Sequence, residues 1–380
     1  GESARQASVT TGNVQGSSSQ RLLFVDIVRA YACVMMVFGH TFNDLLSESI
    51  RRTTLFIEWQ HFRGLTAPTF LFVSGFAFYV ATTRYWDDYL RWSPRLWRRL
   101  RRVALLLFIG YALHLPFSNP LQIFTTPLTA TQWLSWMNVD ILQCVAANLL
   151  SLHILIALLR TRRRFLTYIG IAMPLLFLLS PLIWLLNGQA ASPQLWNFYI
   201  GGNFNSYFPM VPWVGFMYGG ILAAHWHQSR FKMRDDWHGS FFLAGLAVLA
   251  FGLPIYWVFL RLPAALKFGT LAAHSLWLRL GCVVLLFTGI SALARKVRSV
   301  PWIIRLVGSE TLTIYWLHLL IIYGSAWNIG LVRRFGRSLN LLEAFVVFVP
   351  MFLTLVLLVV VKDKALRWWR TRRPSPAAAD

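Results

Sequence analysis

Long apolar runs separated by short polar stretches recur along the whole chain. Most of the runs approach the roughly 20 residues that an α-helix needs to cross the core of a bilayer. We therefore predict an all-α polytopic membrane protein, a bundle of about ten transmembrane helices. The membrane domain covers 21–362, between an N-terminal tail (1–20) and a basic C-terminal tail (363–380). The predicted spans are 22–46, 65–83, 103–117, 141–159, 165–186, 208–226, 241–260, 276–293, 306–323 and 341–361.

The first apolar run carries four ionisable side chains, Asp26, Arg29, His40 and Asp44. On an α-helix they fall within an arc of about 60°, and Arg29 and His40 are about 16 Å apart along the axis. Ionisable groups at membrane depth are expensive and usually functional. This stripe therefore predicts a helix face that is turned toward protein or water and that reaches both leaflets.

The distribution of basic residues predicts the orientation of the bundle. Of the 36 Lys and Arg residues, 26 fall on the side of the N-terminus and only seven on the opposite side. Cytoplasmic loops are the ones that carry an excess of Lys and Arg. Both termini are therefore predicted to be cytoplasmic, which puts His40 near the outer face.

The composition narrows the possible partners and cofactors. The hydrophobic share of 57% and the predicted spans indicate membrane lipid as a partner. Basic loops that face anionic lipid explain the net charge of +22, so nucleic acid is not predicted as a partner. Cys33, Cys144 and Cys282 lie at span depth without a disulfide or metal-binding pattern, so no metal is predicted. Residues 1–20 are rich in Ser, Gln and Gly and are predicted to be disordered rather than a signal peptide. A homo-oligomer is compatible with the sequence.

His40 and Asp44 are spaced for acid–base chemistry. A histidine takes up a proton near neutral pH with little adjustment of its pKa. Asp44 follows one helical turn later, where a carboxylate can hold the second ring nitrogen and fix the tautomer. The alternative is that His40 only forms a hydrogen bond with a neighbouring helix.

Several motifs resemble those of a known superfamily. In the segment DIVRAYACVMMVFGH an Arg and a His are separated by ten intervening residues, and RGLTAPTFLFVSGFAF ends an apolar run near Ser74 and Gly75. The segments YFPMVPWVGFMYGG and GSETLTIYWLHLLIIY follow later in the chain. In this order they resemble the transmembrane acyltransferase superfamily, which includes acyltransferase family 3 and the heparan-α-glucosaminide N-acetyltransferase-like proteins.

The resemblance implies an integral membrane acyltransferase in a bacterial cytoplasmic membrane. It would move an acyl group, most simply acetyl, from cytoplasmic acyl-CoA to a carbohydrate or glycolipid acceptor at the outer face. Cationic groups near the inner opening would then bind the phosphates of the coenzyme. The alternative for Asp26 and Arg29 is an ion pair that only compensates charge within the bundle. The alternative for the arginines after the second span is the positive-inside rule alone. The donor-binding candidates are Asp26, Arg29, Ser74, Arg95, Arg98, Arg99, Arg101 and Arg102.

There are two further sets of candidates, of which the first follows from the resemblance and the second from position in the predicted spans. Some relatives appear to use a histidine in the outer loop after the first span, and His61 in EWQHFRG is the equivalent here, so His40 and His61 both remain candidates for the base. Asn138, Asp140, Gln143 and His318 are candidates for acceptor binding. A helix cap explains Asn138 or Asp140 almost as well.

Two other functional classes would also place polar side chains at membrane depth. A transporter or flippase for a lipid-linked or small polar substrate also places polar groups inside a bundle, but the chain lacks the paired, interrupted spans typical of such proteins. A haem protein would need facing histidines such as His40 and His318. No function is predicted for the remaining histidines, His114, His153, His225, His227, His238 and His274.

Overall fold

The computed structural model describes residues 23–372 apart from 117–118, 120, 203–205, 232–235, 264–274 and 297–299. All elements within these residues are helices. The long helices are α1 (Leu23–Leu45), α4 (Thr66–Thr83), α5 (Pro94–Leu113), α8 (Ile141–Leu159), α9 (Arg162–Asn187), α11 (Met210–Arg230), α12 (His238–Leu260), α14 (Leu276–Arg295), α16 (Thr311–Tyr323) and α18 (Leu341–Thr371). The short ones are α2 (Glu48–Arg51), α3 (Thr54–Arg63), η1 (Trp86–Tyr89), α6 (Gln122–Thr125), α7 (Ala130–Trp136), α10 (Leu195–Ile200), α15 (Trp302–Ser309) and α17 (Leu331–Phe335).

The helical bundle confirms an all-α polytopic membrane protein. In the described part of the chain, seven helices are long and apolar enough to cross a membrane, or eight if the bent pair α15–α16 counts as one span. The sequence predicted about ten, and the difference lies in α5 and α11. The first turns of α5 carry five arginines, which lower the average hydropathy of that helix. Helix α11 is largely buried between its neighbours, so it does not need to be as apolar as a lipid-facing helix.

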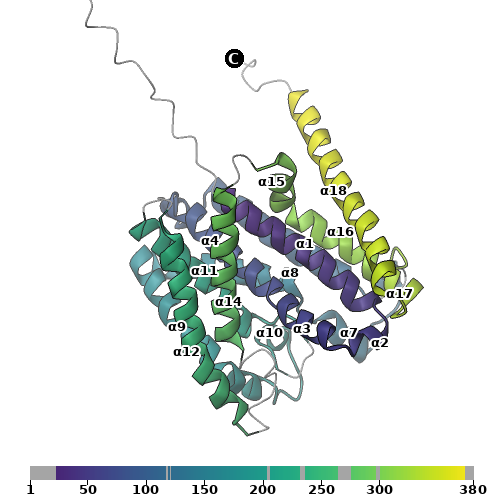
Figure 1. The fold of residues 1–380 in the computed structure, drawn as a ribbon, viewed down its shortest axis with the longest axis horizontal. Coiled ribbons are helices and arrows are strands. Elements are labelled where there is room, and N and C mark those ends of the chain that lie inside the picture. Colours follow the sequence, from purple (N-terminus) through teal and green to yellow (C-terminus); the bar gives the residue numbers. More distant parts are fainter. Residues whose placement is uncertain are drawn as a thin grey trace, which may run out of the picture.

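Helix α1 crosses the front of the molecule between two packed groups of helices (Figure 1). Val25 and Val28 join the larger hydrophobic core, which includes residues of α4, α8, α9, α11 and α14. Val37 and Leu45 join a smaller core with α16 and α18. Because both cores hold α1, its polar face has a fixed position relative to the helices on either side.

Helices α4 and α11 pack at backbone contact. A Cβ atom at Gly75 would overlap the carbonyl oxygen of Met217, and one at Gly220 would overlap that of Phe72. Only glycine permits such an approach, as at other small-residue interfaces between membrane helices. Gly75 is the second residue of the Ser-Gly pair in the predicted second span, so this pair is part of the packing.

Helix α5 begins well before the predicted third span. The Ser93 side chain accepts a hydrogen bond from the backbone N–H of Leu96 (3.1 Å), and Pro94 occupies the first helical turn. A Ser cap followed by Pro is a strong signal for a helix start. The arginines from Arg95 to Arg102 fall between the predicted second and third spans, but in the structure they form two turns of helix and not a loop.

The predicted ninth span is broken in the structure. Helices α15 and α16 meet at 74°, and Glu310 between them lies outside helical geometry. Gly308 contacts the backbone of Asp26 so closely that no side chain fits between them. The close contact holds the end of α15 against the start of α1.

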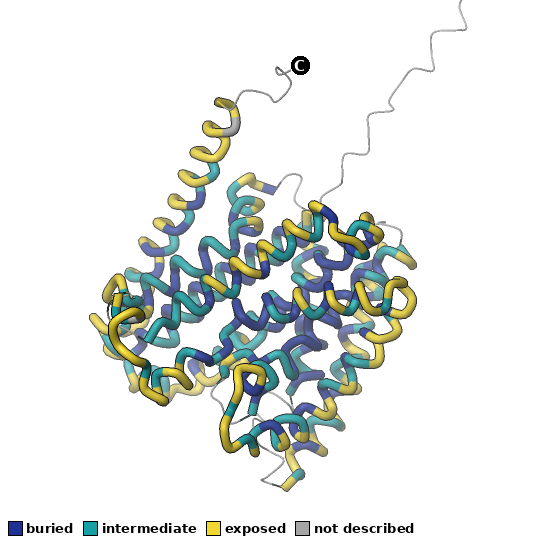
Figure 2. Tube along the Cα trace, turned by 180° about the vertical axis from the view of Figure 1, so that it is seen from behind, coloured by how far each residue is buried: buried dark blue, intermediate teal, exposed yellow. Residues whose placement is uncertain are grey.

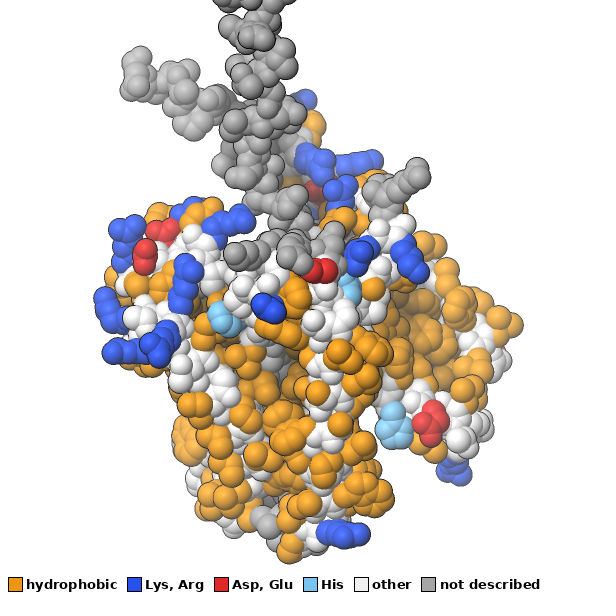
Figure 3. Space-filling view, turned by 60° about the vertical axis from the view of Figure 1, so that its left-hand side comes forward, with side chains coloured by type: hydrophobic (Ala, Val, Ile, Leu, Met, Phe, Trp, Pro, Cys, Tyr) orange, Lys and Arg blue, Asp and Glu red, His pale blue; other side chains and the backbone are white. Residues whose placement is uncertain are grey.

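The surface is consistent with a membrane setting. Hydrophobic side chains cover most of the face in Figure 3, and Lys and Arg gather at one end. Helix α18 continues ten residues past the predicted span, and its last turns are exposed beyond the bundle (Figure 2). The Asp363–Arg367 ion pair, at 2.9 Å, joins neighbouring turns of this extension. The predicted tail 1–20 lies outside the described residues, as do residues 373–380 of the predicted C-terminal tail.

Candidate functional site

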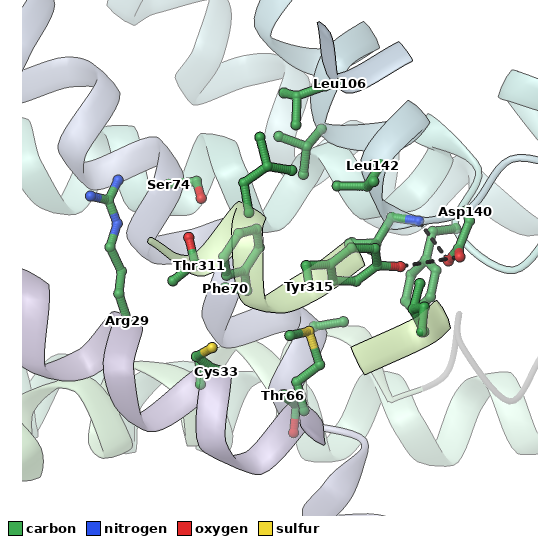
Figure 4. A pocket seen from close by; sticks show the side chains of 18 of the residues that line it. Arg29, Cys33, Thr66, Phe70, Ser74, Leu106, Asp140, Leu142, Thr311 and Tyr315 are labelled. Carbon is green, nitrogen blue, oxygen red and sulfur yellow. Dashed lines mark hydrogen bonds between the residues drawn. The ribbon is translucent and has the colours of Figure 1, made fainter. Parts of the chain in front are cut away.

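A cavity of about 1140 Å³ follows the polar face of α1. Its lining includes Arg29, Cys33, His40 and Asp44 of this helix, together with residues of α4, α5, α8 and α16. Figure 4 shows the part between Arg29 and Asp140. Fifteen residues separate Arg29 from Asp44, which is about 22 Å along an α-helix. The cavity thus connects two regions of different chemistry, and we call them the basic end and the histidine end.

The histidine end comprises His40, Asp44, Tyr323, His114, Asp140 and Tyr315, which all line the cavity. The Tyr323 hydroxyl donates a hydrogen bond to Asp44 Oδ2 (2.5 Å) and lies 2.6 Å from His40 Nδ1. Since the phenolic proton is directed to Asp44, His40 Nδ1 must carry the proton that it shares with the Tyr323 oxygen. His40 Nε2 is then left with its lone pair, which is the form that can act as a base.

The sequence predicted that Asp44 holds the ring of His40 directly, but the structure inserts Tyr323 between them. On its other side, Asp44 Oδ1 accepts a hydrogen bond from Asn43 (2.8 Å). Asn43 accepts one from Gln60 (2.6 Å), and Gln60 accepts one from Arg63 (2.9 Å). This series of hydrogen bonds fixes the carboxylate from the side of α3.

A second group of polar side chains at the histidine end surrounds Asp140. Asp140 caps α8 by accepting a hydrogen bond from Ile141 N (2.7 Å), and its other oxygen accepts one from the Tyr315 hydroxyl (3.1 Å). His114 Nε2 lies 3.6 Å from the same oxygen, while His114 Nδ1 donates to the carbonyl of Gly110 (2.8 Å). Asp140 is therefore both a helix cap and a cavity residue (Figure 4).

His318 connects these two groups from behind the cavity wall. Its ring centre is 5.3 Å from that of His40 and 5.4 Å from that of Tyr315. The side chain is fully buried, and Nδ1 donates to the carbonyl of Ile314 (3.0 Å). His318 does not belong to the cavity lining given by the described residues, so it supports the wall rather than facing it.

The basic end comprises Arg29, Arg99 and Arg102, which come from α1 and α5. Ser74 and Thr311 add hydroxyl groups to this part of the lining (Figure 4). Ser309 lines the same cavity. Arg99 also lies over the rings of Phe78 and Tyr89, with 5.5 Å from its guanidinium carbon to either ring centre. Three guanidinium groups facing one space suit a ligand with several phosphates.

The other arginines of α5 do not line the cavity in the described structure. Arg98 and Arg101 are exposed, and Arg95 pairs with Asp88 and lies over the ring of Tyr85. Hydrogen bonds from Arg91 and Arg95 hold the pKa of Asp88 below its usual value. These side chains therefore belong to the surface of the bundle.

Four further candidates also lie outside the cavity lining. His61 is exposed on α3 and lies 3.7 Å from Glu58, so His40 is the only one of the two candidate bases that lines the cavity. Asp26 is buried beside Gly308. Gln143 is buried against Gly110 of α5, and Asn138 precedes the start of α8.

The sequence interpretation missed several cavity residues. Tyr323 and Tyr315 were not predicted as site residues. Tyr323 ends its predicted span, where a tyrosine is usually an interfacial anchor. Arg63 and Arg279 line the cavity as well and lie near the outer ends of their predicted spans. His114 and His153, which had no predicted function, also line it. The signal available for the arginines was their position at membrane depth.

Comparison with known families gives one match. The family model of the heparan-alpha-glucosaminide N-acetyltransferase catalytic domain matches residues 21–261. The matched range covers more than half of the 380 residues and includes α1, α4, α5 and α8. It ends before α16, so Tyr315 and Tyr323 lie outside it. No curated protein and no solved structure matches the chain.

Proposed function

From the membership of this chain in the heparan-alpha-glucosaminide N-acetyltransferase catalytic family, we propose that it is an acetyltransferase. In this proposal the acetyl group moves from cytoplasmic acetyl-CoA to a carbohydrate acceptor at the outer face of the membrane. The chain is a multi-pass membrane protein of acetyltransferase type. One observation carries the finer proposal. A single cavity joins three arginines at its basic end to a hydrogen-bonded histidine at the other end.

The basic end has the chemistry for the donor. Arg29, Arg99 and Arg102 are suited to the phosphates of coenzyme A, and the hydroxyl groups of Ser74 and Thr311 are available to the polar arm. The thioester supplies an activated acyl group. The length of the cavity supports an extended ligand that reaches from the basic end toward His40.

The histidine end has the chemistry for transfer. In this proposal His40 Nε2 takes the proton of the acceptor amine or hydroxyl as that group attacks the acyl carbon. Asp140, Tyr315 and His114 form the opposite polar wall, where a carboxylate and a phenol can bind sugar hydroxyls. The aromatic side chains of Phe208 and Trp213 border the same cavity and are suitable for stacking on a sugar ring.

The test of this function uses right-side-out membrane vesicles loaded with acetyl-CoA that carries a labelled acetyl group. The external acceptors are an oligosaccharide ending in glucosamine and its N-acetylated counterpart, which offers hydroxyl groups only. We expect label on at least one acceptor outside the vesicles, and none when the donor is supplied outside. Labelling only with external donor would reverse the proposed direction, and movement of intact sugar without acetylation would indicate a transporter.

Donor binding is expected to depend on the two α5 arginines that line the cavity. Each charge-assisted hydrogen bond contributes about 1.5–3 kcal/mol, so Arg99→Ala/Arg102→Ala is expected to weaken acetyl-CoA binding by at least about tenfold. The matched control is Arg98→Ala/Arg101→Ala, which removes the same charge from two positions of the same helix that do not line the cavity. Calorimetry on purified protein measures both. Equal losses in the two double variants would mean that charge alone, and not the cavity, governs binding.

A further inference from the structure

Tyr323 is the structural link between His40 and the carboxylate that supports it. Its hydroxyl contacts His40 Nδ1 at 2.6 Å and Asp44 Oδ2 at 2.5 Å. The ring of Tyr323 also meets the ring of His40 edge to face, with 5.6 Å between the ring centres. Among the described hydrogen bonds, Asp44 reaches His40 only through this hydroxyl group.

The position of Tyr323 is set by the end of α16. Gly324 follows with φ of 78°, in the left-handed region that favours glycine, and it pairs with Ile329 in an isolated bridge. Asn328 donates a hydrogen bond to the carbonyl of Leu320 (2.7 Å), which closes the turn. The chain thus ends its helix at Tyr323 and fixes the direction in which the phenol leaves the backbone.

Asp44 is likewise fixed from its other side. Asn43 binds its second oxygen, and Gln60 and Arg63 continue this series of hydrogen bonds. Both partners of Tyr323 belong to α1, and Asp44 is held from the side of α3 as well. A phenol between a fixed carboxylate and an imidazole has one arrangement of protons that satisfies all three groups, the one derived above.

We propose that Tyr323 is a positioning residue that transmits the charge of Asp44 to His40 during acyl transfer. The inference rests on the proposed acyltransferase function and assigns a role that neither the family match nor the sequence motifs give. It replaces the direct acid–histidine contact of a catalytic triad with a relay through tyrosine.

The relay stabilises the protonated histidine without carrying a proton away. As the acceptor attacks, its N–H or O–H bond breaks and the proton moves to His40 Nε2, while the new bond to the acyl carbon forms. The C–S bond then breaks, and His40 Nε2 returns the proton to the leaving thiolate. Throughout, Nδ1–H stays on His40 and O–H stays on Tyr323, and both hydrogen bonds strengthen while the imidazolium is charged.

The experiment is a double-mutant cycle on Tyr323→Phe and Asp44→Asn, with acetyl-CoA as donor and the glucosamine-terminated oligosaccharide as acceptor. We expect Tyr323→Phe to lower kcat by about 10–100-fold and to leave the KM for acetyl-CoA within about threefold. Because Asp44 acts through Tyr323, adding Asp44→Asn to Tyr323→Phe should cost less than about threefold more. Independent structural roles would instead multiply the two losses.

The matched control is Tyr111→Phe. It removes a hydroxyl group that is hydrogen bonded to the Tyr199 hydroxyl at 2.9 Å and that is outside the cavity lining, so kcat should not change. Acetyl-CoA binding by each variant shows that it is folded.

The outcomes separate the relay from the proposed function. Wild-type kcat in Tyr323→Phe together with an inactive His40→Ala overturns the relay and leaves the function standing. Losses in the double variant that equal the product of the single losses also overturn the relay. Absence of transfer by the wild-type protein overturns the function and the relay with it.

Discussion

Replacing His40 by Ala is expected to lower the turnover of acyl transfer by about 10²–10⁴-fold, the usual contribution of positioned proton transfer. The structure gives this histidine a lone pair on Nε2, a place in the cavity wall and a carboxylate support. The basic end is about 16 Å away along α1, so acetyl-CoA binding should be preserved. The measurement is transfer from labelled acetyl-CoA, with binding followed by calorimetry.

His61→Ala is the matched control for this variant. His61 is exposed and paired with Glu58, away from the cavity lining, so its loss should leave turnover within about twofold. Full activity in His40→Ala with none in His61→Ala would move the base to the segment before the second span. Full activity in both variants would remove the proposed base from the mechanism.

Adding one methyl group at Gly75 is expected to unfold or strongly destabilise the bundle. The new Cβ would overlap the backbone of Met217, which cannot move aside as a flexible side chain can. Overpacking in a close-packed interior usually costs about 1–3 kcal/mol, and contact with backbone places Gly75→Ala at or above the upper end. Thermal unfolding of purified protein in detergent measures the change.

Gly170→Ala and Gly289→Ala serve as controls within the same protein. Both glycines lie in helices, α9 and α14, and a Cβ atom there would meet nothing within 4 Å. Removing glycine from a helix interior usually adds about 0.5–1 kcal/mol of stability. Equal melting temperatures for Gly75→Ala and the two controls would contradict the close contact between α4 and α11.

The polar face of α1 could be predicted from the sequence because it depends on one helix alone. A period of 3.6 residues is enough to bring Arg29, His40 and Asp44 to one side, and the cavity follows that side. Asp26, predicted on the same face, is instead buried against Gly308 and does not line the cavity. The resemblance to a known superfamily then predicted acyl-transfer chemistry for this face. Neither inference requires knowledge of how the other helices are placed.

The partners of these residues depend on packing between distant helices, which periodicity does not reveal. Tyr323 is 283 positions from His40, and Asp140 is 175 positions from Tyr315. The helical arrangement of the α5 arginines was missed for a different reason. The sequence contains a helix start signal, Ser93 followed by Pro94. A helix that starts there places Arg99 and Arg102, three positions apart, on one helix face.

A long cavity inside a membrane protein can also provide a path for ions across the membrane. Five arginines line this cavity, against two carboxylates among the described lining residues. Such a surplus of fixed positive charge in a low-dielectric space opposes the entry of protons and metal cations, as arginines do in selective pores. The charge that would bind the proposed anionic donor would therefore also limit ion leakage, so acyl transfer would proceed without discharging the membrane potential.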